Sequence, residues 1–248
     1  MVPKLTSVGL AAWLVLAAGS PLSAARASSA LEERDAVRET LIEALRTSRK
    51  SDGPDHEEVV ATIQGLGSAT IQLTLDILVQ CRIPALHEGD EVQILSQPQR
   101  DMLLAGLALW SPRTSTDAIE ARLAVAQGPR ERLAGIYVYA AVGQGAQLQR
   151  VIELALPTES DAPLPERLPK DTEKAVREAF ARILTRDPRA YDSMRTTIER
   201  APACLHKPIV FALGDTRDPC GIEPLALVLA FHEDLAPLIV GQARLLGR

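Results

Sequence analysis

The feature that most constrains the fold of this chain is a recurring pattern. An apolar helical stretch ends at a turn, and a second helical stretch follows at once. The turn positions are Gly67, Trp110, Gly143, Thr185, Gly214 and Gly247. Successive positions are 43, 33, 42, 29 and 33 residues apart. A period in this range is typical of helical repeat proteins, in which each unit buries its apolar face against its neighbours.

Composition favours helices and excludes several other classes. Hydrophobic residues make up 46% of the 248 residues but aromatic residues only 3%, with 36 alanines and 35 leucines. Alanine and leucine favour helices, whereas strands favour β-branched and aromatic residues, so an all-β fold is excluded. The apolar content excludes a disordered chain. A formal net charge of −5 argues against a nucleic-acid binder.

Several turns contain residues that favour the start or the end of a helix. Asp187-Pro188 and Asp218-Pro219 are 31 residues apart and occupy equivalent places in the pattern. An aspartate at N-cap accepts hydrogen bonds from free helix N–H groups, and proline suits the first helical position. Gly143 and Gly214 lie where a left-handed residue would end the preceding helix. Two insertions lengthen the pattern, at residues 82–92 and in the proline-rich segment 156–170, where a helix is not expected.

The N-terminal 27 residues have the features of a signal peptide. Lys4 precedes the uncharged apolar stretch 8–19, and the small residues Ala25 and Ala27, at positions −3 and −1, predict cleavage after Ala27. An uncleaved signal anchor is the alternative, although the apolar stretch is shorter than the roughly 20 residues that span a bilayer. Cleavage removes Lys4 and Arg26 but no acid, so the net charge changes from −5 to −7. We therefore expect an exported mature chain, periplasmic or extracellular, with no membrane contact and no nucleic-acid partner.

Residues 28–55 are expected to form an amphipathic helix and a linker. The apolar positions of this helix share one face: Leu31, Val37, Leu41, Ile42 and Leu45. Residues 51–55 (SDGPD) predict a turn or linker before the repeats of residues 56–248.

One stretch resembles a known family. Residues 207–225 contain Ala212-Leu213-Gly214-Asp215, then Asp218-Pro219, Ile222 and Leu225, which is similar to a HEAT repeat of the bacterial bilin-lyase-like, armadillo-type class. Residues 132–154 and 173–198 match this pattern more loosely, and 56–127 match only in spacing. The resemblance implies an all-α fold, a right-handed α-solenoid of stacked helix pairs. Residues 56–248 would hold about five pairs and a final half repeat.

Candidate chemistry is sparse. His56, His87, His206 and His232 have no second histidine at helical metal-site spacing, and no nucleophile motif occurs. The glycines of Gly143-Gln-Gly145 follow no strand and predict an interhelical turn. His56-Glu57-Glu58 and His232-Glu233-Asp234 are expected to begin helices. We assign no catalytic, metal or cofactor-binding residue, and no cofactor.

The cysteines and aromatic residues are expected to be structural. Cys81, Cys204 and Cys220 are an odd number, and the last two are expected to begin separate helices too far apart to bridge, so small buried thiols are predicted. Tyr137 and Tyr139 fall inside an apolar helix over 129–142, where core or groove packing is favoured over ligand binding. Trp110 is expected to cover a helix junction.

These observations leave two functions open. The first is an exported, non-catalytic scaffold or adaptor that binds a protein or peptide, and the alternative is an enzyme or accessory lyase built on the same repeats. A groove along the second helices would display Glu120, Arg122, Arg150, Glu153, Arg195 and Glu199, for which solvated ion pairs are the favoured interpretation. The apolar residues of 232–248 predict either self-association through the C-terminal helix or a shortened chain.

Overall fold

The computed structural model describes residues 21–48, 55–67, 70–110, 116–125, 128–157 and 164–247. Contacts divide the chain into two units, Met1–Ala36 and Val37–Arg248. The described part of the first unit is helical and forms the start of α1 (Pro21–Thr47). Most of the expected leader and residues 51–54 of the expected linker lie outside the described residues. Cleavage after Ala27 stays a prediction.

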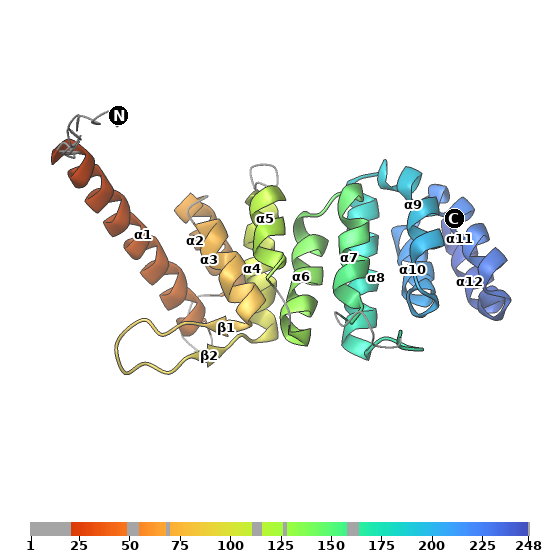
Figure 1. Cartoon of the computed structure of the whole chain (residues 1–248), viewed down its shortest axis with the longest axis horizontal. Helices are drawn as coiled ribbons and strands as arrows, with labels where there is room; N and C mark the ends of the chain where they lie inside the picture. The colour runs from red at the N-terminus through yellow and green to blue at the C-terminus, as the bar shows by residue number, and fades with distance from the viewer. Residues whose placement is uncertain are drawn as a thin grey trace, which may run out of the picture. The chain divides into compact units, whose positions relative to one another are not determined.

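The described residues are mostly helical and form twelve helices, of which those after α1 lie in the second unit and pack against one another there (Figure 1). After α1 come α2 (His56–Leu66), α3 (Thr70–Gln80), α4 (Gln97–Trp110), α5 (Thr116–Leu123), α6 (Pro129–Val142), α7 (Leu148–Ala155), α8 (Lys170–Arg186), α9 (Ala190–Arg200), α10 (Ala203–Thr216), α11 (Ile222–Phe231) and α12 (Ala236–Leu246). Short 3-10 helices precede three of them: η3 (Gly145–Gln147), η4 (Pro219–Gly221) and η5 (Glu233–Leu235). The prediction of an all-α fold is confirmed.

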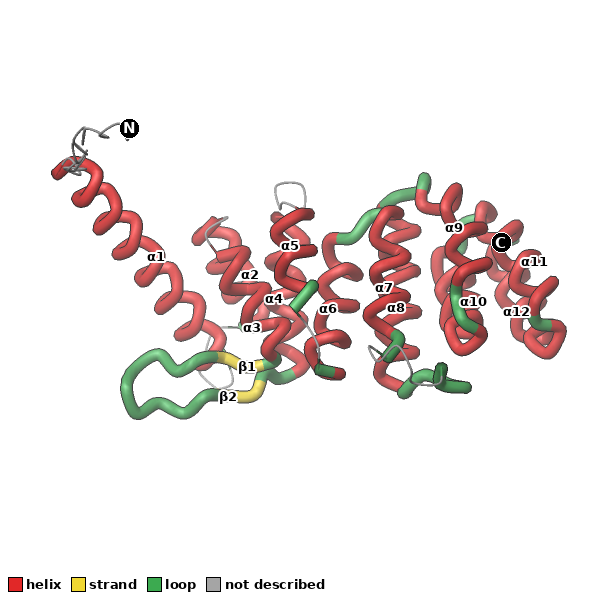
Figure 2. Tube along the Cα trace, in the orientation of Figure 1, coloured by secondary structure: helices red, strands yellow, loops and turns green. Residues whose placement is uncertain are grey.

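The helices of the second unit pack in the order of the chain. Helices α4, α6, α8, α10 and α12 form one row, in which each contacts the next. Helices α7 and α9 lie in front of α8 and α10 (Figure 2). Helix α9 contacts α11, and η3 contacts both α7 and α9. One continuous apolar core runs through the unit and includes Leu41, Ile42 and Leu45 at the end of α1. The predicted apolar face of the opening helix is therefore confirmed at these three positions.

Local sequence explains where several helices begin and end. Asp55 caps α2: its Oδ1 accepts from the Glu58 backbone N–H at 2.9 Å, and Glu58 accepts in return from the Asp55 N–H at 3.1 Å. Gly67 ends α2 at a φ of 75°, a left-handed value that favours glycine. The Trp110 ring lies 3.9 Å from where a Gly67 Cβ would stand, so it covers this junction as expected. The predicted helix over 129–142 is also confirmed, because α6 has those bounds.

The predicted left-handed role of two glycines is wrong. Gly143 follows α6 at a φ of −65°, and Gly214 lies within α10, which ends instead at the left-handed Arg217 (φ 54°). Both glycines instead lie at close approaches. A Cβ on Gly143 would lie 2.6 Å from the Tyr139 carbonyl oxygen of the backbone, and one on Gly214 would lie 2.6 Å from Cδ of the flexible Gln242 side chain in α12.

The two Asp-Pro turns share one local hydrogen bond, in which the aspartate accepts from the backbone N–H two residues on. Asp218 caps η4, because its Oδ1 accepts from the Cys220 backbone N–H at 2.9 Å, which confirms that prediction. Asp187 precedes α9, which begins at Ala190, and its Oδ1 accepts from the Arg189 backbone N–H at 3.2 Å, the bond equivalent to that of Asp218. Its Oδ2 also accepts from the Gly145 N–H at 2.9 Å, so Asp187 joins the end of α8 to η3. Thr185 lies within α8, one residue before the last helical residue.

The first insertion forms a small hairpin. Strand β1 (Arg82–Ile83) pairs antiparallel with β2 (Gln93–Ile94). Arg46 at the end of α1 donates to the carbonyl oxygens of Pro84 at 3.1 Å and Glu91 at 2.8 Å, so it holds the connecting loop. In the second insertion, the described residues 156–157 and 164–169 are not helical, as predicted.

Gly106 is expected to be one of the least replaceable positions of the fold. Its Cβ would lie 2.6 Å from Cγ2 and 3.1 Å from Cβ of the buried Ile63, where α4 packs on α2. The Gly106→Val change should lower the free energy of unfolding by about 1–3 kcal/mol in urea titrations, because a branched side chain at Ile63 cannot move aside. Gly65→Ala in α2 is the matched control, since nothing lies within 4 Å of its added Cβ. Equal effects of the two changes would contradict this packing.

Candidate binding groove

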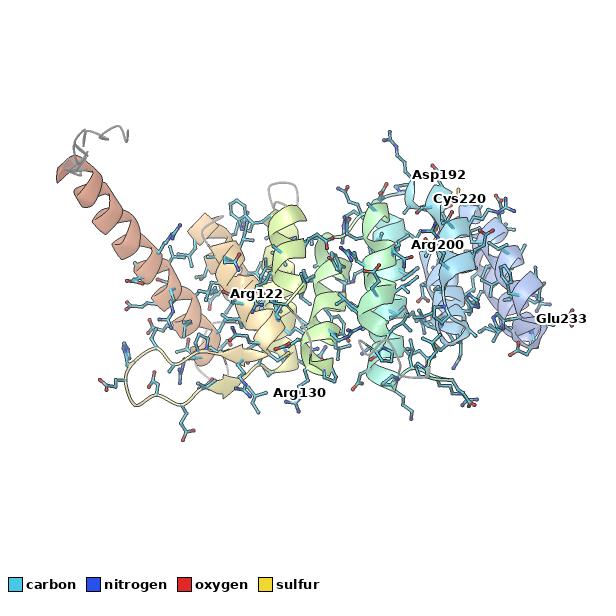
Figure 3. The ribbon with its side chains drawn as sticks, viewed as in Figure 1. Arg122, Arg130, Asp192, Arg200, Cys220 and Glu233 are labelled. Carbon is cyan, nitrogen blue, oxygen red and sulfur yellow. The ribbon has the colours of Figure 1, made fainter. Side chains whose placement is uncertain are left out.

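A groove of about 910 Å³ opens between α9 and α11. Its α9 wall presents Tyr191, Asp192 and Arg195, and its end is formed by Pro219 and Cys220 of η4. Figure 3 shows Asp192 and Cys220 next to each other at this end, with Arg200 farther along α9. We define these two helix faces and the η4 end as the α9–α11 groove.

The α11 wall is apolar although it faces solvent. Ile222, Ala226 and Ala230 recur every four residues, so they form one exposed stripe along the helix, and Ile222 is 50% exposed. The opposite face of α11 is in the core, where Leu225 and Val228 are fully buried. A helix that is apolar on all sides is normally covered on all sides. The stripe is therefore an exposed apolar surface without a partner among the described residues.

The α9 wall is polar. The Tyr191 hydroxyl donates to Thr216 Oγ1 at 2.8 Å, which fixes its half-buried ring, and burial raises the pKa of the phenol. Arg195 forms an ion pair with Glu199 at 3.3 Å. Within the described residues, Asp192 has no lysine or arginine partner. The groove thus has an apolar wall on α11 and a polar wall on α9. The polar wall carries Arg195, which is paired with Glu199, and the carboxylate of Asp192.

The thiol at the groove end is exposed. A hydrogen bond to the Asp218 carboxylate and the charge of Asp218 raise the pKa of Cys220, with a further contribution from Asp192, so the group is held as a thiol rather than a reactive thiolate. All three cysteines are free, which confirms that Cys204 and Cys220 do not bridge. The expectation of buried thiols is wrong: Cys81 directly follows α3 and is half-buried, as is Cys204, and Cys220 lies in a surface turn.

A second hollow of about 480 Å³ lies over α5, α6 and α7. Arg150 in this hollow forms ion pairs with Glu120 at 3.3 Å and Glu153 at 2.5 Å. Tyr139 is 2% exposed, and burial together with its hydrogen bond to Glu120 raises the pKa of its phenol. The polar positions predicted from the sequence are thus ion pairs. Glu120, Arg150 and Glu153 also line the hollow, whereas Arg122 pairs with Asp76 of α3 and does not line it. The two tyrosines of α6 pack in the core as expected.

Arg132 forms the floor of this second hollow and is buried. Its guanidinium donates to the carbonyl oxygens of Leu154 at 3.1 Å, Glu153 at 2.5 Å and Leu156. These carbonyls are at the C-terminus of α7, where a cation is favoured by the helix dipole. Because its donors are occupied in this way, Arg132 serves the structure rather than a ligand.

Two of the four histidines meet in space. His206 of α10 and His232 after α11 have ring centroids 4.6 Å apart, which their separation in the sequence did not predict. His206 is 5% exposed, its Nε2 lies 3.1 Å from the Ile198 carbonyl oxygen, and its Nδ1 has no partner in the described residues. In the ranges described above, no group of three or more histidine, cysteine or acidic residues could hold a metal ion.

The buried histidine is expected to make stability depend on pH. Burial lowers the pKa of His206, with a smaller contribution from His232, so the unfolded chain binds a proton at higher pH than the folded chain. The free energy of unfolding should therefore fall as pH falls below about 6.5, by at most about 1.4 kcal/mol per pH unit. Urea titrations at several pH values should show a shallower slope for His206→Gln and an unchanged slope for the exposed His56→Gln. A wild-type slope in His206→Gln would contradict the assignment.

The comparisons with known proteins found no relative. No protein-family model, curated protein or solved structure matches this chain. None of the described helices has the length and apolar character needed to cross a membrane. The groove is therefore interpreted from its own geometry and chemistry.

Proposed function

We propose that this chain is an exported, non-catalytic helical-repeat scaffold that binds a protein or peptide partner in the α9–α11 groove. In this proposal residues 1–27 are a signal peptide, and residues 56–248 form a right-handed HEAT-like solenoid. The chain-order packing of the helices supports the repeat architecture. N-terminal sequencing of the mature protein is expected to begin at Ser28, and an uncleaved N-terminus would favour the signal anchor.

The observation that carries the proposal is the exposed apolar stripe of α11. Ile222, Ala226 and Ala230 face the groove while the other side of the helix fills the core. An apolar surface of this kind, rimmed by polar residues, is typical of a protein-interaction site. The ion pairs of the second hollow are internal contacts, which makes that hollow the weaker candidate.

Affinity capture from the exported fraction of the source cells tests this function. The wild-type chain is expected to retain a partner that Ala226→Arg loses, since an arginine would place a long, charged side chain on the apolar stripe. Ala61→Arg in α2 is the matched control, because Ala61 is also an exposed helical alanine but lies outside the groove. Failure of the wild-type chain to retain any partner would contradict the scaffold function. A visible absorbance shift on titration with a tetrapyrrole would favour the accessory-lyase alternative.

Self-association through α12 is the second part of the proposal. Val240 and Leu245 of this helix are 49% and 39% exposed, whereas Ile239 and Leu246 are buried against the preceding helices. Sedimentation of the wild-type chain should show a concentration-dependent dimer, and the Val240→Asp/Leu245→Asp variant should remain monomeric. The single change Glu233→Gln, at an exposed position of η5, should leave the dimer intact. A wild-type monomer at all concentrations would refute self-association.

A further inference from the structure

We infer that the occupant of the α9–α11 groove is an amphipathic α-helix of a partner protein, with a basic residue beside its apolar face at the η4 end. This inference rests on the proposed function and specifies its partner class. Three observations carry it: the apolar stripe of α11, the small size of two residues in that stripe, and the acidic side chains at one end of the groove.

The apolar wall favours a helix over an extended peptide. The stripe of Ile222, Ala226 and Ala230 offers only side-chain carbon, and Glu223 beside it offers acceptors but no donor. No strand edge lies among the residues that line the groove, so this wall cannot satisfy the backbone groups of an extended peptide laid against it. Buried backbone N–H and C=O groups without partners are costly, whereas a helix satisfies them internally. A partner helix of about 12 residues, at 1.5 Å rise per residue, covers the stripe with room at each end.

Small residues set how closely the partner can approach. Ala226 and Ala230 leave a shallow channel, bounded at one end by the larger Ile222 and along one side by Leu227. Side chains of a second helix can fill such a channel when they recur at three- and four-residue intervals. The channel therefore selects an apolar face with this spacing on the partner.

The acidic residues at the η4 end of the groove favour a basic residue beside the apolar face of the partner helix. Asp192 and Glu223 line the η4 end of the groove, and within the described part of the chain neither forms an ion pair with lysine or arginine. Asp218 lies at the same end, where it hydrogen-bonds to Cys220. The only groove cation, among the residues described, is Arg195, and it is engaged with Glu199. A lysine or arginine at this end of the partner helix therefore meets free carboxylates.

The test uses three fluorescent peptides of about 12 residues with the same leucine and alanine stripe. The first carries lysine beside the stripe in its terminal turn, the second carries glutamate there, and the third is the lysine peptide with a central proline. Fluorescence anisotropy with the full chain measures the dissociation constants. The lysine peptide should bind about fivefold tighter than the glutamate peptide, the scale of an exposed ion pair. The proline peptide should bind at least about tenfold more weakly, because it cannot stay helical.

Variants of the groove make the test specific. Ala226→Arg should weaken binding of the lysine peptide at least about tenfold, as expected for blocking the centre of an interface. Ala61→Arg should leave the affinity unchanged, and thermal melts should show both variants folded. Asp192→Lys should abolish the preference for the lysine peptide, because Glu223 remains beside the new cation. Asp101→Lys, at an exposed position of α4, should leave the preference unchanged.

Several results would overturn the inference. These are equal affinity for the lysine and glutamate peptides, undiminished binding of the proline peptide, no binding of any peptide at about 100 μM, or a self-dimer that Ala226→Arg dissociates. If the capture experiment retains a partner that Ala226→Arg loses and no helical peptide binds, the scaffold function stands and only the helical partner is wrong. If the lysine peptide binds as expected and no partner is captured, the scaffold function fails instead.

Discussion

Replacing Phe180 with alanine is expected to lower the free energy of unfolding by about 3–5 kcal/mol. Phe180 is fully buried in α8, which packs on α6 on one side and on α10 on the other. The loss combines the transfer free energy of the ring with a cavity between two helix contacts. Urea titration followed by circular dichroism measures it.

Phe231→Ala is the matched control for this prediction. Phe231 ends α11 and is 52% exposed, so its truncation removes little buried area. The expected change is below about 1 kcal/mol. A Phe180→Ala loss no larger than that of Phe231→Ala would show that α8 is not the centre of the packed unit.

The second large effect is expected at Arg132. The Arg132→Met change should lower the free energy of unfolding by about 2–3 kcal/mol, because three carbonyl groups at the C-terminus of α7 lose a charged donor. Burial lowers the pKa of the guanidinium, so part of this loss is offset when the buried cation is removed. The size of the net loss therefore measures how far the carbonyl contacts outweigh the cost of burying the charge.

Two variants separate the charge from the geometry. Arg132→Lys keeps the cation but has no planar fork, so it should lose less stability than Arg132→Met. Arg195→Met, at an exposed ion pair of α9, should change stability by under about 1 kcal/mol. Unchanged or increased stability of Arg132→Met would mean that the buried charge costs more than its hydrogen bonds return.

Local signals made much of the helical architecture predictable. Helix α6 occupies the predicted 129–142 because Pro129 suits the first helical position and Tyr137 and Tyr139 follow the context of the apolar helix around them. Helix α2 begins at the predicted His56, directly after Asp55, whose side chain accepts from the backbone N–H of Glu58 three residues later. These signals involve residues within about one helical turn of each other, so they can be read directly from the sequence. The HEAT-like solenoid itself remains a proposal.

Interactions between distant residues were not predictable in this way. Gly214 permits the approach of Gln242, and Asp187 bonds Gly145, across 28 and 42 residues respectively. Both contacts depend on how neighbouring helices are placed, which the local pattern does not specify. For the same reason the turn chemistry alone gave the wrong role for Gly214 and missed the second bond of Asp187, to Gly145.

The candidate groove was only partly predictable. The sequence identified Arg195 as a polar position of a second helix, and the structure places it in the groove wall. The stripe of Ile222, Ala226 and Ala230 was missed, because α11 is apolar on every side and periodicity cannot tell its exposed face from its buried one. The exposed face depends on which side α10 and α12 cover.

The central claim is that the α9–α11 groove is the partner-binding surface, and site-specific photo-crosslinking tests it most directly. Benzoylphenylalanine would replace Ala226 in the full chain, and Ala61 in the control, followed by irradiation in the source cells and mass spectrometry. We predict that the Ala226 probe crosslinks the same partner that affinity capture retains, through a helical segment with a basic flank. Crosslinking of that partner from Ala61 but not from Ala226 would contradict the claim.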